Sequence, residues 1–68
     1  MGNVNLKLKS KRALYNVSQE KLRKYIGINV TTYSFKENRK VDFTLREMEK
    51  IVQFFKNYEP DITLNDLF

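Results

Sequence analysis

Cysteine and histidine are both absent from this 68-residue chain. Their absence excludes disulfide frameworks, zinc sites ligated by either residue and catalytic triads built on either residue. The chain also has no apolar run close to the roughly 18 residues of a membrane span, and it shows no signal-peptide pattern. We therefore expect no membrane partner and a cytoplasmic location.

Patterns typical of enzymes are missing as well. The sequence has no Gly-rich phosphate loop, no carboxylate cluster and no pairing of a nucleophile with a base. Helix capping and an exposed helix surface account for Asp42, Glu47 and Glu49. The sequence therefore predicts a protein that is not an enzyme and that uses no cofactor and no metal ion.

Charge and length favour a small basic domain. Lysine and arginine outnumber aspartate and glutamate by 13 to 8, so the net charge is +5. This balance favours a polyanionic partner, although many small domains are equally basic. A core of this size is marginal, so we expect a single domain over residues 1–68 in which almost every apolar residue is used.

Residues 18–37 read as two short helices joined by a tight turn. Ser18 can cap the first helix, Gly27 supplies the left-handed backbone common at a helix end, and Asn29 can cap the second. One face of the first helix carries Leu22, Tyr25 and Ile26. Because so few residues separate the two helices, they must cross steeply. That is the geometry of a helix-turn-helix, whose second helix can enter a DNA major groove.

A helix is also predicted before this unit, over residues 4–15, with Asn16 in the left-handed position after it. One side of this helix carries Val4, Leu8 and Tyr15. The helix is strongly basic, through Lys7, Lys9, Lys11 and Arg12. These side chains have two interpretations: a solvated helix face, which we favour for any single lysine, or phosphate contacts by one or two of them.

Two further helices are predicted after the unit. Thr44 and Glu47 form a capping box that starts a fourth helix. Its apolar stripe consists of Leu45, Met48, Ile51, Val52 and Phe55. Pro60 lies in a break, and Thr63 caps a last short turn at residues 64–68. We expect that turn to return Leu64, Leu67 and Phe68 to the core.

The order and spacing of several short motifs carry a family resemblance. They are Lys9-Ser10-Lys11-Arg12, Ser18-Gln19-Glu20-x-Leu22, Gly27-Ile28-Asn29, Glu37-Asn38, Asp42-Phe43-Thr44 and the run from Ile62 to Phe68. Together they resemble the Cro and repressor-type helix-turn-helix family of phages and bacteria. The resemblance implies an all-α, five-helix, lambda-repressor-like DNA-binding domain that binds operator DNA.

The resemblance also implies the residues that contact DNA. Gln19 occupies a position that contacts a phosphate or a base edge, the helix after the turn presents base-facing positions, and the loop after it grips the backbone. The predicted DNA-binding residues are Gln19, Asn29, Val30, Thr31, Thr32, Ser34, Phe35, Asn38, Arg39 and Lys40. Arg12 and Glu37 match a pair that forms a partly buried salt bridge in similar proteins.

Several positions depart from the family pattern. Arg23 replaces the usual Ala, and Tyr33, which we expect to point inward, replaces the usual Ile or Val. Arg39 replaces the common Gly, which leaves the conformation of the following loop open. The chain between Phe55 and Ile62 is longer than typical, so the fourth helix has room to run on to Tyr58.

The leading functional hypothesis is a transcriptional repressor of phage or mobile-element type that occupies an operator. The alternative is an antirepressor or another protein-interaction module on the same fold, because Phe35 on the reading helix could anchor a regulatory protein partner. Phe35 could equally contact thymine methyl groups or lie partly in the core.

Assembly is the last expectation. Similar proteins bind palindromic sites as two-fold dimers, so we expect a homodimer through the carboxyl-terminal region, including dimers that form only on DNA. The predicted partner surface consists of Phe54, Tyr58 and Phe68, while Leu64 and Leu67 are assigned to the monomer core.

Overall fold

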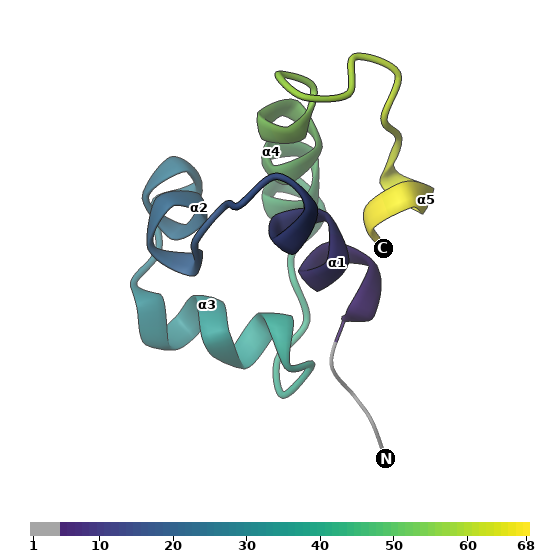
Figure 1. Ribbon diagram of the computed structural model, residues 1–68. Coiled ribbons are helices and arrows are strands. Elements are labelled where there is room, and N and C mark those ends of the chain that lie inside the picture. Colours follow the sequence, from purple (N-terminus) through teal and green to yellow (C-terminus); the bar gives the residue numbers. More distant parts are fainter. Residues whose placement is uncertain (1–4) are drawn as a thin grey trace.

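The computed structural model describes residues 5–68, which form five helices and no strand. The helices are α1 (Leu6–Leu14), α2 (Gln19–Ile26), α3 (Val30–Glu37), α4 (Leu45–Phe55) and α5 (Leu64–Leu67). In Figure 1, α3 runs along the lower edge with α2 above it, and α4 stands upright at the top. Helix α4 packs against α2 and α5, and α5 packs against α1. The all-α, five-helix, lambda-repressor-like fold is confirmed.

Each of the first four helices begins at a polar residue that supplies a cap. Ser18 Oγ accepts the Lys21 amide at 3.0 Å, and Asn29 Oδ1 accepts the Thr32 amide at 2.7 Å. The predicted capping box is present at the start of α4, through Thr44 and Glu47. These side chains satisfy amides that have no partner inside their own helix.

The start of α1 differs from the prediction. Asn5, which lies within the helix expected over residues 4–15, is instead its cap, and Asn5 Oδ1 accepts the Leu8 amide at 3.2 Å. Its backbone amide donates to the Glu37 carbonyl at 2.8 Å, which ties the start of α1 to the end of α3. Val4, predicted on the buried side of α1, lies outside the described residues.

Three helices end with a residue in the left-handed conformation: Asn16 at φ 56°, Gly27 at φ 92° and Arg39 at φ 62°. The first two confirm predictions. A Cβ on Gly27 would meet no atom within 4 Å, so the positive φ rather than crowding calls for glycine there. Arg39 is the unexpected case, because left-handed backbone costs an L-residue other than glycine roughly 1–2 kcal/mol.

The core lies where all five helices meet. Its buried apolar residues are Leu8, Val17, Leu22, Ile26, Tyr33, Ile51, Phe54, Phe55, Ile62 and Leu67. Tyr33 points inward as predicted, and its ring packs edge-on against Phe43, with centroids 5.8 Å apart. The larger ring is thus accommodated between α3 and the segment that leads into α4.

Three apolar residues lie elsewhere than predicted. Phe54, assigned to a partner surface, is buried because its ring packs on Tyr25 of α2 at 5.2 Å. Leu45, assigned to the buried stripe, is 59% exposed, since it begins α4 at the outer edge of the fold. Leu64 is also exposed, whereas Leu67 of the same short helix is fully buried as expected.

Helix α4 ends at Phe55 and does not continue to Tyr58. Residues 56–58 form a turn in which the Tyr58 amide donates to the Phe55 carbonyl at 2.9 Å. The Asn57 side chain donates to the Phe54 carbonyl at 2.9 Å, a local bond that competes with helix continuation. None of the five helices in residues 5–68 is long and apolar enough to cross a bilayer.

Candidate nucleic-acid interface

Helix α3 is presented at the edge of the molecule by the turn that follows α2. In Figure 1 the two helices cross steeply, and α3 has no helix below it. Of the ten predicted contact residues, six are exposed: Asn29, Val30, Thr31, Phe35, Arg39 and Lys40. The other four are half-buried: Gln19, Thr32, Ser34 and Asn38. Nine of the ten residues therefore lie on α3, at its amino-terminal cap or in the loop after it, and Gln19 lies at the start of α2.

A buried carboxylate fixes α3 from behind. Glu37 accepts two hydrogen bonds from Arg12, with Nε–Oε2 at 2.7 Å and Nη2–Oε1 at 2.9 Å. It also accepts Gln19 Nε2 at 2.8 Å and the Tyr33 hydroxyl at 2.9 Å. The ion pair implied by the family resemblance is therefore formed, and it is one part of a larger cluster. Three elements, α1, α2 and α3, meet at this one side chain.

The protonation of the cluster follows from its contacts. Burial alone raises the pKa of Glu37, but the hydrogen bonds from Arg12, Gln19 and Tyr33 more than offset it, so the pKa lies below its ordinary value. The hydrogen bond to Glu37 outweighs desolvation and raises the pKa of Arg12. Burial is the main cause that raises the pKa of Tyr33. Glu37 is therefore ionised at neutral pH, while Arg12 stays charged and Tyr33 stays a donor.

Gln19 has a structural role that its predicted DNA contact does not describe. One N–H of its amide is used in the bond to Glu37. A DNA contact would therefore use the other N–H or the carbonyl oxygen of the same amide. In that arrangement the contact and the position of α3 depend on one side chain.

The outer face of α3 is apolar and hydroxylic rather than charged. Phe35 is 44% exposed and does not pack against the core, so the interpretation that places it partly in the core is wrong. Val30 and Thr31 are also exposed, and Lys40 Nζ lies 5.5 Å from the centroid of the Phe35 ring. Such a face can contact thymine methyl groups and accept or donate through a hydroxyl.

The loop after α3 is a Schellman motif, which answers the question left by the replacement of glycine. The Lys40 amide donates to the Phe35 carbonyl at 2.8 Å, and the Arg39 amide donates to the Lys36 carbonyl at 3.1 Å. Arg39 occupies the left-handed position that glycine normally takes. The loop therefore keeps a standard geometry and carries one additional cation.

Sequence reasoning missed an ion pair that ties α3 to α4. Lys36 Nζ lies 2.6 Å from Glu47 Oε1, and both side chains are largely buried. The same carboxylate oxygen accepts the Thr44 amide in the capping box. The capping box identified Glu47 as structural, but no spacing rule connects it with Lys36.

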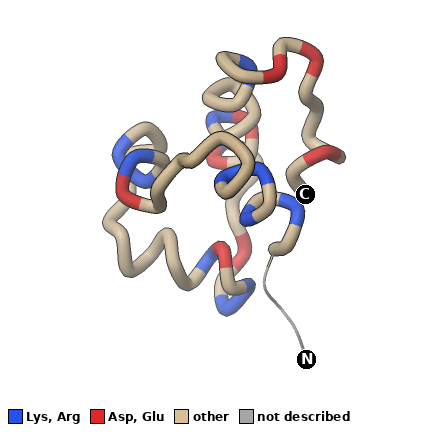
Figure 2. The backbone as a smooth tube through the Cα atoms, in the orientation of Figure 1, with Lys and Arg blue, Asp and Glu red and all other residues tan. Residues whose placement is uncertain are grey.

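Charge is distributed unevenly over the molecule. Figure 2 shows basic residues on α1, on α2 and at the end of α3, while α3 itself is mostly uncharged. The part of the chain after residue 56 carries Glu59, Asp61 and Asp66 and no lysine or arginine. Attraction to phosphates would therefore come from the flanks of α3 and not from its outer face.

Comparison with known protein families agrees with this geometry. A model of the helix-turn-helix family matches residues 8–62, which is most of the chain. Searches of curated proteins and of solved structures gave no match. The chain belongs to the Cro and repressor-type helix-turn-helix family, and it is a DNA-binding transcription regulator of that type.

Proposed function

We propose that the chain is a repressor of phage or mobile-element type that acts in the cytoplasm by occupying an operator in duplex DNA. The observation that supports this most is the position of α3, whose rear is held by buried Glu37 while its outer face is exposed. A helix fixed in this way can enter a major groove without rearrangement. The resemblance of the motifs to small phage-type members supports the proposed origin.

Within this proposal the ten residues divide by role. Val30, Thr31, Ser34 and Phe35 contact base edges, whereas Gln19, Asn38, Arg39 and Lys40 contact the backbone, and Asn29 and Thr32 lie at the start of the reading helix. Side chains of the first group discriminate bases less sharply than bidentate Arg or Gln contacts do. Part of the specificity should therefore come from the shape of the DNA.

Selection of bound sequences from a random duplex pool tests the proposal. We expect enrichment of a defined site, with affinity that falls as salt rises. Lys40→Ala should weaken binding to all sequences and lower the salt slope by about one unit. Lys50→Ala is the matched control, because Lys50 is an exposed cation on α4 that is not among the proposed contacts. No enriched site, or equal effects of the two variants, would contradict the proposal.

We also propose that the operator-bound form is a homodimer. Tyr58 remains exposed, which supports this member of the predicted surface, whereas buried Phe54 is withdrawn from it and half-buried Phe68 packs against Phe43. A groove of about 540 Å³ lies in the same carboxyl-terminal half of the chain, between α4 and residues 62–64. Mass in solution and stoichiometry on a selected operator test this. One monomer on an asymmetric site at saturation would contradict it.

One observation favours the second candidate, an antirepressor or protein-interaction module. Phe35 is a large exposed aromatic ring at the centre of the proposed reading surface, and such rings anchor protein interfaces. Phe35→Ala distinguishes the two functions. A change in site preference supports base contact, whereas intact DNA binding together with loss of a protein partner supports the interaction module.

A further inference from the structure

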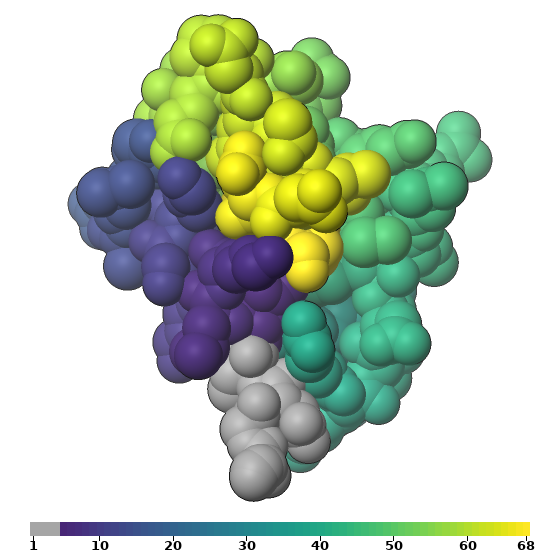
Figure 3. Space-filling view, turned by 90° about the vertical axis from the view of Figure 1, so that its right-hand side faces the viewer, coloured from purple at the N-terminus to yellow at the C-terminus, as the bar shows by residue number. Residues whose placement is uncertain are grey.

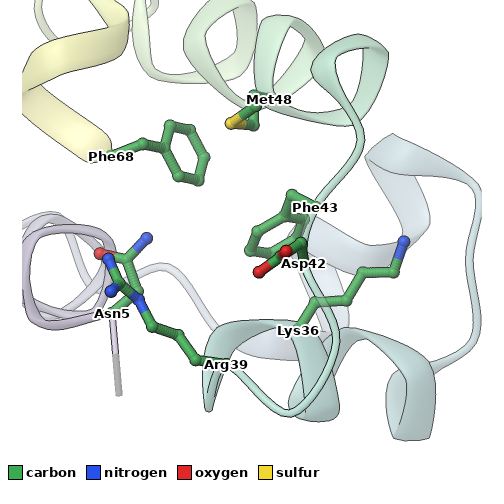
Figure 4. Close-up of a pocket in the computed structure, with 7 residues that line it drawn as sticks. All are labelled: Asn5, Lys36, Arg39, Asp42, Phe43, Met48 and Phe68. Atoms are coloured by element: carbon green, nitrogen blue, oxygen red, sulfur yellow. The ribbon is translucent and has the colours of Figure 1, made fainter. Parts of the chain in front are cut away.

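A cavity of about 380 Å³ lies on another face of the molecule. Figure 3 shows this face hollowed between α1, the segment that joins α3 to α4, and the carboxyl-terminal residues. The cavity is lined by Asn5, Lys36, Arg39, Asp42, Phe43, Met48 and Phe68 (Figure 4). Its volume falls in the range of roughly 300–1,000 Å³ that is typical of small-molecule sites.

One part of the lining is apolar. The rings of Phe43 and Phe68 meet edge to face, with centroids 5.6 Å apart, and Met48 lies across from them in Figure 4. Lys36 adds its aliphatic stem only, because its ammonium group points away from the cavity and pairs with Glu47. This side of the cavity suits an apolar side chain.

A buried amide faces the cavity. Asn5 is only 5% exposed, and its Oδ1 is directed to the Leu8 amide by the cap of α1. The cap turns Nδ2 toward the cavity, on the side of Phe68 (Figure 4). Within residues 5–68, Nδ2 donates to no protein group, and it is not among the fully buried atoms that lack a partner, so water can reach it. A ligand with an acceptor atom would satisfy this donor.

Two opposite charges complete the lining. The Arg39 side chain extends toward Asn5, and the Asp42 carboxylate points into the open space (Figure 4). Among the described residues, neither forms an ion pair. Since Lys36 is neutralised by Glu47, the cavity offers one cation, one anion and one amide donor, with no net charge.

We propose that the cavity binds a free α-amino acid with an apolar side chain. The ligand carboxylate would meet Arg39 and Asn5, its ammonium group would meet Asp42, and its side chain would lie on the apolar lining. A simple anion would be repelled by Asp42 and a simple cation by Arg39, while a hydrocarbon would leave the Asn5 amide unpaired. A zwitterion with an apolar body matches all three groups.

Binding has a consequence that rests on the proposed function. Arg39 belongs to the loop after α3 and is one of the proposed backbone contacts. A ligand that holds its guanidinium group in the cavity removes a cation from the DNA surface. We therefore expect operator affinity to fall several-fold when the cavity is filled.

Binding can be tested on the isotope-labelled chain without DNA, using three matched probes. L-Phenylalanine carries both charges, phenylacetate lacks the ammonium group, and 2-phenylethylamine lacks the carboxylate. We expect L-phenylalanine to shift the NMR signals of the Asn5 side chain and of residues around the cavity, with an affinity at least tenfold above either analogue. Equal binding of the three probes, or no shifts at these residues, would overturn the site.

Two variants assign the contacts. Asp42→Asn should reduce L-phenylalanine to the affinity of phenylacetate, and Arg39→Gln should reduce it to that of 2-phenylethylamine. Both residues are exposed, so the fold should persist, which the NMR spectrum checks directly. Lys56→Gln, directly after α4 and outside the lining of this cavity, is the matched control. Variants that bind all probes like the parent would overturn the assignment.

The regulatory consequence is tested by measuring operator affinity with and without saturating L-phenylalanine. A several-fold loss supports the regulatory consequence. Unchanged affinity, with the NMR shifts intact, overturns that consequence alone. A chain that shows the NMR shifts but binds no duplex DNA overturns the proposed function and leaves the amino-acid site standing.

Discussion

Two glutamates are each held by a cation from α1, but they lie in different surroundings. Lys11 and Arg12 are neighbours in sequence, and each reaches a carboxylate in a different part of the molecule. Arg12 binds Glu37 at the end of α3, while Lys11 Nζ lies 2.6 Å from Glu59 in the turn after α4. The side chain of Glu37 is 2% exposed and that of Glu59 is 29% exposed. Each glutamate also accepts a hydrogen bond from a tyrosine hydroxyl. The two clusters therefore have nearly the same bonding partners, but water reaches Glu59 far more easily than Glu37.

Access of water decides what each cluster does for the fold. At Glu59, water can replace either partner, and exposed ion pairs contribute little to stability. At Glu37, loss of the carboxylate would leave a charged guanidinium group buried without compensation. The position of α3, and with it the proposed reading surface, therefore depends on the buried cluster, while the turn after α4 does not depend on its ion pair.

Replacing each glutamate by glutamine is the strongest test of this difference. We expect Glu37→Gln to lower the free energy of unfolding by about 3 kcal/mol, because Arg12 loses its counter-charge in a largely buried site. Glu59→Gln is the matched variant and should cause no measurable change. Urea denaturation at neutral pH gives both values. Equal losses would show that burial is not what separates the two clusters.

Acid should weaken the buried cluster as well. The folded-state pKa of Glu37 lies below its ordinary value of 4.5. A carboxyl group of this kind stabilises the fold above its ordinary pKa, and the stabilisation is lost as pH falls through the folded-state value. Unfolding measured below pH 4.5 should therefore depend less on pH in Glu37→Gln than in the parent.

The control for this acid test is Glu59→Gln. Hydrogen bonds from Lys11 and Tyr15 also hold the pKa of Glu59 below its ordinary value, but solvent screens these contacts. The pH dependence of this variant should stay close to that of the parent. A larger flattening for Glu59→Gln than for Glu37→Gln would reverse our ranking of the two groups.

Exchanging the cations should give a smaller effect. Arg12 binds both oxygens of Glu37 and donates from Nη1 to the Val17 carbonyl at 3.0 Å. Lysine cannot reproduce this planar fork, so Arg12→Lys should cost about 1.5 kcal/mol. Lys11→Arg should be neutral in the same denaturation experiment. A neutral Arg12→Lys would mean that charge alone holds α3.

Removing the tyrosine hydroxyls should give the smallest effect. Tyr33→Phe removes one buried hydrogen bond to Glu37, and we expect a loss of about 1 kcal/mol. At the half-buried cluster of Lys11, Tyr15 and Glu59, the hydrogen bond to Glu59 raises the pKa of Tyr15 to about 12. Tyr15→Phe should nevertheless leave thermal unfolding unchanged. A larger loss for Tyr15→Phe would indicate that its stacking on Tyr58 responds to the hydroxyl.

Local sequence rules predicted the parts of this fold that depend on near neighbours. The caps at Ser18, Asn29 and Thr44 and the left-handed residues Asn16 and Gly27 all follow from a few adjacent positions. Each of these caps and left-handed residues acts on backbone groups within about one helical turn. At that range the residue type alone indicates where a helix begins or ends. The helix-turn-helix could therefore be predicted before any tertiary contact was known.

Contacts between distant residues left no comparable signal. The pairing of Arg12 with Glu37 was expected from the family resemblance, whereas the pairings of Lys11 with Glu59 and of Lys36 with Glu47 were not expected. Charged residues on a helix usually face water, so periodicity cannot identify the few that cross to another element.

The proposed reading surface was predicted only as a set of positions. Resemblance to the family indicated which residues surround α3, but not that Gln19 also binds Glu37 or that Lys40 lies over Phe35. The burial of Phe54 was missed for a related reason, since its neighbour Tyr25 belongs to another helix. In each case the residue that makes the contact either lies far away in the sequence or is reached only because a side chain points in one particular direction.

The packing of α5 on α1 bears on the order in which the chain folds. Lys7 Nζ donates to the Asn65 carbonyl across 58 positions, whereas the turn between α2 and α3 joins residues that are close in sequence. Closing a long loop is entropically costly, so near contacts form first. We expect residues 18–37 to be structured in the folding transition state and α5 to dock after it. Truncating Leu67 to Ala would then speed unfolding while leaving the refolding rate almost unchanged.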